Sequence, residues 1–127
     1  MIEVRIEKTA LWVRGHAGFS RYGSDIVCAA ASMLAFALAE AVTAAGLRRP
    51  PVIESERGQF RLEAFAEEEE QARMEGMFAT VCAGYRLLAQ RYPGYVRVLS
   101  EERSENSMRK PENRPLDGQE EEEYEEN

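Results

Sequence analysis

The feature that most constrains the fold is an alanine-rich run, DIVCAAASMLAFALAEAVTAAG, at residues 25–46. Alanine and leucine favour a helix, Asp25 or Ser24 can cap its first turn, and Gly46 can end it. The most apolar part, residues 26–39, is too short to cross a bilayer and is followed at once by Glu40. Because apolar residues occur on nearly all sides, we expect this helix to be covered by a sheet and by a second helix or a partner subunit.

Short alternating segments surround this helix and predict strands. Residues 2–14 place apolar side chains at every second position and predict two strands joined at residues 8–9. Residues 52–56 and 59–65 flank Arg57-Gly58 and predict a hairpin. A last strand is expected in YVRVLS, at residues 95–100.

A second helix is expected over residues 67–92. Its apolar side chains recur at three- and four-residue steps and form one core stripe, which includes Cys82. The four glutamates at 67–70 suit its N-terminus, and Pro93-Gly94 would end it. The predicted order is therefore β-β-α-β-β-α-β, a single α/β domain with two helices on one mixed β-sheet.

The net charge of −7 comes entirely from the C-terminal segment. Residues 101–127 hold four basic and eleven acidic side chains, whereas residues 1–100 are balanced. A segment so acidic and so poor in apolar side chains has little to bury. We therefore expect a folded domain at residues 1–102 and a disordered acidic tail at residues 103–127. The balanced domain has no basic patch that would indicate nucleic-acid binding.

The cysteines and the N-terminus indicate the compartment. Two cysteines, Cys28 and Cys82, favour a reducing cytosol over a disulfide framework. The charged, alternating N-terminus is unlike a secretory signal. We expect a cytoplasmic protein that does not insert into a membrane.

The candidate chemistry lies just before and at the start of the first helix. His16, the only histidine, precedes Cys28 by twelve positions. Cys28 would be the third helical residue, where N–H groups and the helix dipole favour a thiolate, and a nearby imidazole could accept the thiol proton. An oxyanion could be held by N–H groups of the helix start or of the glycine-containing loop between the two residues. No metal or cofactor is expected, since two ligands fall short of the four in a structural zinc site.

Two quoted stretches resemble a known family. GHAG at residues 15–18 and GSDIVCAAAS at residues 23–32 are similar to the ribosomal-processing cysteine proteases of bacteria, often called Prp. The resemblance implies a catalytic dyad of Cys28 and His16, with Asp25 and Ser32 as supporting groups. It also implies a homodimer that removes an N-terminal extension from a ribosomal large-subunit protein precursor, cutting after an aromatic residue.

Residues of the loop that begins beside His16 and leads to Cys28 are expected to contact the substrate. They are Gly15, Gly18, Phe19, Arg21, Tyr22 and Gly23. Two rival functions stay open: a non-catalytic, ribosome-associated peptide-binding module, and a thiol redox sensor that uses Cys28 alone. A lone histidine at the end of a strand is more often a surface or loop-capping residue.

Overall fold

The structure is a computed structural model that describes residues 1–21 and 23–99 of the 127-residue chain. Tyr22, the expected domain boundary at residues 102–103 and the expected acidic tail lie outside the described residues. The elements follow in the order β1 (Ile2–Glu7), β2 (Ala10–Arg14), α1 (Ile26–Ala44), β3 (Val52–Glu56), β4 (Gln59–Glu63), a 3-10 turn (Glu68–Glu70), α2 (Gln71–Arg91) and β5 (Val96–Leu99). The predicted β-β-α-β-β-α-β order is confirmed.

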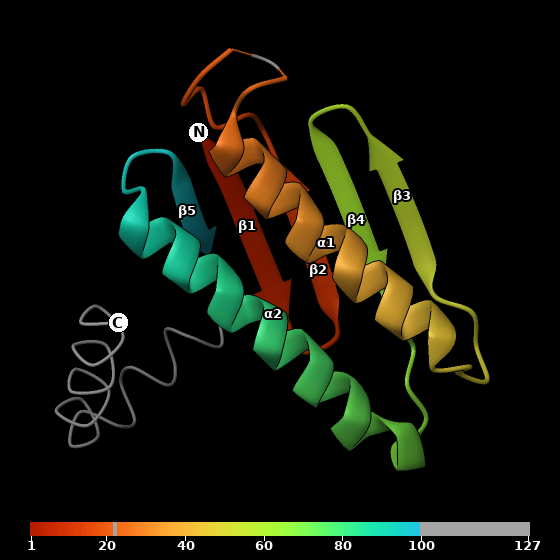
Figure 1. Cartoon of the computed structure of the whole chain (residues 1–127). Helices are drawn as coiled ribbons and strands as arrows, with labels where there is room; N and C mark the ends of the chain where they lie inside the picture. Colours follow the sequence, from red (N-terminus) through yellow and green to blue (C-terminus); the bar gives the residue numbers. More distant parts are fainter. Residues whose placement is uncertain (22, 100–127) are drawn as a thin grey trace, which may run out of the picture.

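The five strands form one mixed sheet in the order β3-β4-β2-β1-β5. Only β1 and β5 are parallel, while the other neighbouring strands are antiparallel. Both helices cover the same face of the sheet (Figure 1), and α2 packs on β1 and β5. Strand β3, at the far edge, lies beyond the helices, and its side chains are partly or fully exposed.

Alternating side chains from the strands and one side of each helix form the core. Helix α1 contributes Val27, Ala31, Ala35, Leu38 and Val42, and α2 contributes Met74, Phe78, Cys82, Tyr85 and Leu88. The buried hydroxyl of Tyr85 donates to the carbonyl oxygen of Ala31 at 2.7 Å and so ties the two helices together. Burial raises the pKa of Tyr85 above its ordinary value, so this hydroxyl stays protonated.

Helix α1 extends beyond the apolar run of residues 26–39. At 19 residues it is long and apolar enough to cross a membrane, as core helices of this composition also are. Here one side packs on the sheet, while Ile26, Met33 and Phe36 are between 50% and 65% exposed. The sheet and α2 therefore leave part of the apolar surface of α1 uncovered within the described residues.

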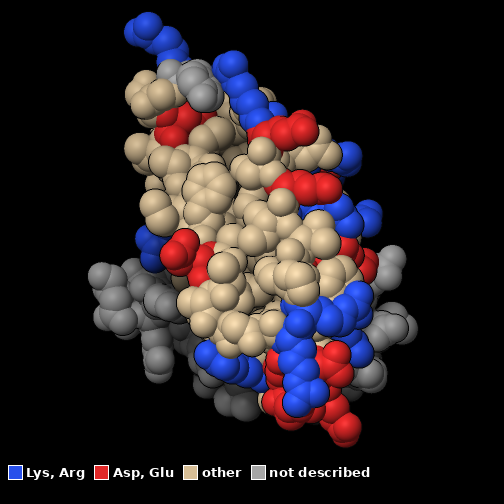
Figure 2. All heavy atoms as spheres, turned by 90° about the vertical axis from the view of Figure 1, so that its right-hand side faces the viewer, with Lys and Arg blue, Asp and Glu red and all other residues tan. Residues whose placement is uncertain are grey.

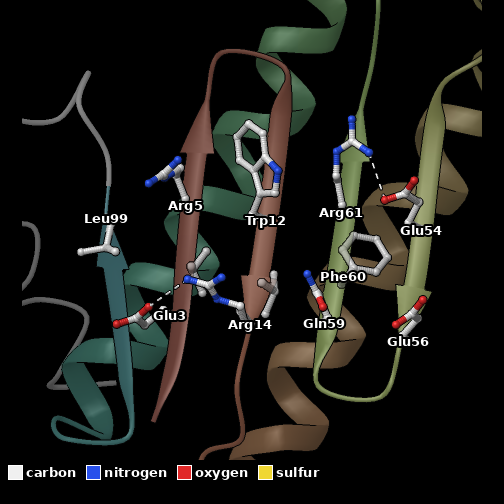
Figure 3. Close-up of a pocket in the computed structure, with 12 residues that line it drawn as sticks. Glu3, Arg5, Trp12, Arg14, Glu54, Glu56, Gln59, Phe60, Arg61 and Leu99 are labelled. Carbon is white, nitrogen blue, oxygen red and sulfur yellow. Dashed lines mark hydrogen bonds and ion pairs between the residues drawn. The ribbon is translucent and has the colours of Figure 1, made fainter.

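Charged side chains dominate the other face of the sheet, which no helix of the described residues covers (Figure 3). A shallow depression of about 310 Å³ there is bordered by Arg5 and Trp12, whose guanidinium and ring lie 5.9 Å apart. Arg61 pairs with Glu54 at 3.0 Å. The lining of this depression includes neither His16 nor a cysteine, so the depression offers no thiol nucleophile.

Candidate active site

Asp25 joins the loop before α1 to the first turn of that helix. As the N-cap, it accepts hydrogen bonds through Oδ1 from the N–H groups of Val27 and Cys28, both at 3.0 Å. Through Oδ2 it accepts from the N–H groups of Phe19, at 2.9 Å, and Ser20, at 3.2 Å. One side chain thus holds the loop against the turn that carries Cys28.

Asp25 is only 8% exposed, yet its surroundings favour the ionised carboxylate. Burial alone would raise the pKa of Asp25, but the four backbone donors together outweigh it and leave the pKa below its ordinary value. Asp25 therefore stays a carboxylate that organises the loop, and it also places a negative charge beside the candidate nucleophile.

Cys28 is the third residue of α1 and is half-buried. Its Sγ accepts a hydrogen bond from the N–H of Ala17, in the loop, at 3.3 Å. The backbone of the loop therefore contacts the sulfur atom of the candidate nucleophile directly.

His16 follows the end of β2 and is exposed. Its imidazole lies against Gly58 in the β3–β4 turn: a Cβ built on Gly58 would be only 2.9 Å from Nε2 of His16. No hydrogen bond joins His16 to Cys28 among residues 1–21 and 23–99. Catalytic hydrogen bonds are often long in the absence of substrate, so this geometry does not separate the pair functionally.

A single cleft brings these residues together. It has a volume of about 840 Å³ and lies between the start of α1 and the β3–β4 hairpin. His16, Asp25, Cys28 and Ser32 all line it. So do the predicted loop residues Gly15, Gly18 and Gly23, and the turn residues Arg57 and Gly58. The sequence-predicted candidates on α1 therefore share one helix face that opens into the cleft.

Apolar side chains line much of the cleft. They are Ile2, Val13, Ala29, Ala31, Ala35, Phe36 and Phe60. The rings of Phe36, on α1, and Phe60, on β4, meet edge to face with centroids 5.8 Å apart. On this side of the molecule uncharged side chains cover the middle, and charged ones lie mainly around the edge (Figure 2). Such a cleft can take apolar side chains of a bound chain.

Two predicted loop residues lie outside the cleft lining. Phe19 packs edge to face on Tyr92 and on Tyr95, with ring centroids 5.4 and 5.2 Å away. Arg21 is exposed and does not line the cleft either. Whether these two residues contact substrate stays a prediction, and Tyr22 is not among the described residues.

The first-turn donors of α1 are already used. The N–H groups of Val27 and Cys28 donate to Asp25 Oδ1, and that of Ala29 donates to the carbonyl oxygen of Asp25 at 3.0 Å. None of these three is free to bind an oxyanion in this conformation.

Gly58, Phe36 and Phe60 are among the cleft residues that sequence reasoning missed. The Arg57-Gly58 turn was predicted, but its contact with His16 joins residues 42 positions apart and leaves no local signal. The two phenylalanines follow ordinary core periodicity. Within the described part of the chain, no group of three or more His, Cys, Asp or Glu side chains could hold a metal ion.

Comparison with known proteins identifies relatives of this fold and site. The family model described as "Cysteine protease Prp" matches residues 1–97, which include the whole cleft. No curated protein sequence matches the chain.

Solved structures share the fold at low sequence identity. The ribosomal processing protease Prp from Staphylococcus aureus, with a covalently linked product peptide, matches with a TM-score of 0.65 and 22% identity, over 79% of this chain and 97% of that one. The same protease with a substrate peptide matches with a TM-score of 0.61 and 20% identity, over the same shares. A Streptococcus mutans protein matches with a TM-score of 0.62 and 23% identity, over 79% of this chain and 93% of that one.

Proposed function

The chain belongs to the cysteine protease Prp family, and we propose that it removes the N-terminal extension from the precursor of a bacterial ribosomal large-subunit protein. The observation that carries this proposal is the shared cleft: Cys28 and His16 both line it, inside the stretch that matches the family. The S. aureus protease, which has the same fold, is named for ribosomal processing and has been solved with substrate and product peptides.

In the proposed reaction His16 accepts the proton of the Cys28 thiol. Sγ attacks the carbonyl carbon of the scissile peptide bond, so that a C–S bond forms and the carbonyl π electrons move to oxygen. Collapse of this oxyanion re-forms the C=O bond and breaks the C–N bond, and the amine leaves with a proton from the His16 imidazolium. Water then attacks the thioester and gives a proton to His16, and the Cys28 thiolate leaves.

The neighbouring residues support this reaction in different ways. Asp25 fixes the loop to α1, so that the N–H of Ala17 stays on Sγ of Cys28. Ser32, one helical turn beyond Cys28, is exposed in the cleft and can contact the bound peptide. The apolar part of the cleft, near Phe36 and Phe60, offers room for apolar side chains of the extension.

The proposal includes a cytoplasmic homodimer. Cys28 and Cys82 are both free thiols, which suits a reducing compartment. The exposed apolar face of α1, with Ile26, Met33 and Phe36, is the surface that a second copy would cover.

The test is cleavage of the full-length ribosomal precursor, with the products identified by mass. The proposal expects one cut after an aromatic residue of the extension by the wild-type protein and none by Cys28→Ala. Tight binding of the precursor without any cleavage would support a peptide-binding module instead. A reversible oxidation of Cys28 with neither binding nor cleavage would support a redox sensor.

A further inference from the structure

The β3–β4 turn meets the candidate dyad through a glycine. The antiparallel ladder between β2 and β4 ends at the pair Arg14 and Gln59, and the next bond runs from the N–H of Gly15 to the carbonyl oxygen of Gly58 at 2.9 Å. His16 is the residue that follows this last bond. The turn is therefore fixed to the backbone from which the imidazole projects.

We propose that Gly58 is a positioning residue for the imidazole of His16, an inference that rests on the proposed protease function. A Cβ at position 58 would lie 2.9 Å from Nε2, 3.3 Å from Cε1 and 3.7 Å from Cδ2 of His16. Real Cβ contacts do not come as close as the first of these distances. The bare Cα of Gly58 thus forms the surface on which the imidazole ring rests.

This contact matters because His16 has few other restraints. The residue is exposed, and among the described residues its side chain makes no hydrogen bond or ion pair that would select one rotamer. An exposed imidazole without a partner samples several rotamers within nanoseconds. Resting on the turn keeps the ring at the wall of the cleft that it shares with Cys28.

The positive φ of Gly58, +77°, would strain any L residue, so a test needs a control for strain. Gly46 supplies it: its φ is +68°, and a Cβ there meets nothing within 4 Å. Asparagine tolerates this backbone region better than most residues. Gly58→Asn and Gly46→Asn therefore carry similar backbone strain, but only the first displaces the imidazole.

The experiment measures precursor cleavage by wild type, Gly58→Asn and Gly46→Asn, with melting curves for each. Because small misplacements of a catalytic group can cost up to about 10²-fold in rate, we expect Gly58→Asn to lower kcat at least tenfold with little change in KM. Gly46→Asn should keep the wild-type kcat. Equal kcat in the two variants, or a loss in Gly58→Asn that is confined to KM, would overturn the inference.

Two further measurements keep the inference testable if Gly58→Asn does not fold. His16 is the only histidine, so its two carbon-bound ring protons are unambiguous in NMR spectra. Wild type should show nuclear Overhauser contacts between these protons and the Cα protons of Gly58, and their absence would overturn the inference whatever the protein's activity. Chemical synthesis, with ligation at Cys28 and Cys82, can also place D-alanine at position 58. A D residue adopts a positive φ without strain. Its methyl group replaces the Cα hydrogen that does not face His16, so the imidazole keeps its place.

Gly58→D-alanine should retain the wild-type kcat, and a large loss of kcat there would contradict the inference. The proposed function fails by a different result, namely no cleavage by wild type or full cleavage by Cys28→Ala. Failure of the Gly58 inference and failure of the protease assignment are therefore distinguishable.

Discussion

The two cysteines show how position in a helix decides what a thiol can do. Cys28 lies in the first turn of α1, is half-buried, lines the cleft and accepts the N–H of Ala17 at 3.3 Å. Cys82 lies in the middle of α2, is 8% exposed and packs within the core. Only Cys28 shares the cleft with His16, so of the two thiols it is the one that we propose as the nucleophile.

Two carboxylates, Asp25 at the start of α1 and Glu70 at the start of α2, differ in the same way in what their positions allow. Before α2, Glu70 accepts the N–H of Glu67 at 2.8 Å and that of Arg48 at 3.1 Å, and these donors, the first above all, hold the pKa of Glu70 below its ordinary value. Asp25 has a lowered pKa for a similar reason, but its donors include the loop beside the thiol. Both residues stabilise a turn, and only Asp25 does so at the cleft.

The largest expected difference is between substitutions of the two thiols. Cys28→Ala and Cys28→Ser should lower precursor cleavage by at least about 10³-fold and leave the fold intact, because the nucleophile is gone. Cys82→Ser should keep its turnover and lose about 1–3 kcal/mol of stability, since it buries a hydroxyl in an apolar site. Cleavage assays with melting curves measure both, and full turnover by Cys28→Ala would contradict the comparison.

The next effect separates proton transfer from binding. His16→Ala should lower kcat by about 10²–10⁴-fold, the usual range for loss of a general acid–base group, with little change in KM. Steady-state kinetics on an extension peptide would show this. A loss that appears only in KM would move His16 from catalysis to substrate recognition.

A smaller effect is expected from substitution of Asp25, which holds the loop to α1. In Asp25→Asn an amide N–H₂ group would face backbone N–H donors that now meet a carboxylate oxygen, so the loop should loosen and kcat should fall by roughly tenfold. Glu70→Gln at the start of α2 is the matched control and should keep the wild-type kcat. Similar losses in both variants would show that turn stability, and not the position of the loop, limits the rate.

The lowered pKa of Asp25 predicts the direction in which stability changes with pH. Because the pKa of Asp25 is lower in the folded than in the unfolded chain, its carboxylate stabilises the fold fully above the unfolded-state pKa. This stabilisation is lost as pH falls through the folded-state pKa. The gap in melting temperature between wild type and Asp25→Asn should therefore narrow on acidification, and a gap that widens in acid would refute this role.

The smallest effect on turnover should come from the exposed side of α1. Met33→Glu places a charge on the apolar face and should shift a dimer toward monomer, as measured by sedimentation at tens of micromolar. Gln90→Glu, at an exposed position of α2, is the control and should leave the association unchanged. A wild-type protein that is already monomeric at this concentration would remove the dimer from the proposal.

Sequence patterns predicted most of the fold because the apolar periodicity is strong. The strands over residues 2–14, the hairpin turn at Arg57-Gly58 and Asp25 as the cap of α1 were all predicted correctly. Ends of elements were less exact: β4 stops at Glu63 and not at residue 65, and residues 68–70 form a 3-10 turn before α2. Such details depend on tertiary contacts that periodicity does not encode.

The site was only partly predictable for the same reason. The grouping of Asp25, Cys28 and Ser32 follows from helical spacing, and the structure places all three in the cleft. The contact of Phe19 with Tyr92 and the contact of His16 with Gly58 join distant parts of the chain. Only the folded arrangement of the sheet reveals contacts of this kind.

The most direct test of the central claim compares the two thiols in one native sample. The protein is treated with iodoacetamide near neutral pH, the alkylated residues are identified by peptide mass, and the remaining precursor cleavage is measured at each time point. The account predicts that Cys28 is alkylated first, that cleavage is lost in proportion, and that Cys82 reacts only after unfolding. Alkylation of Cys82 before Cys28, or full cleavage by protein alkylated at Cys28, would contradict it.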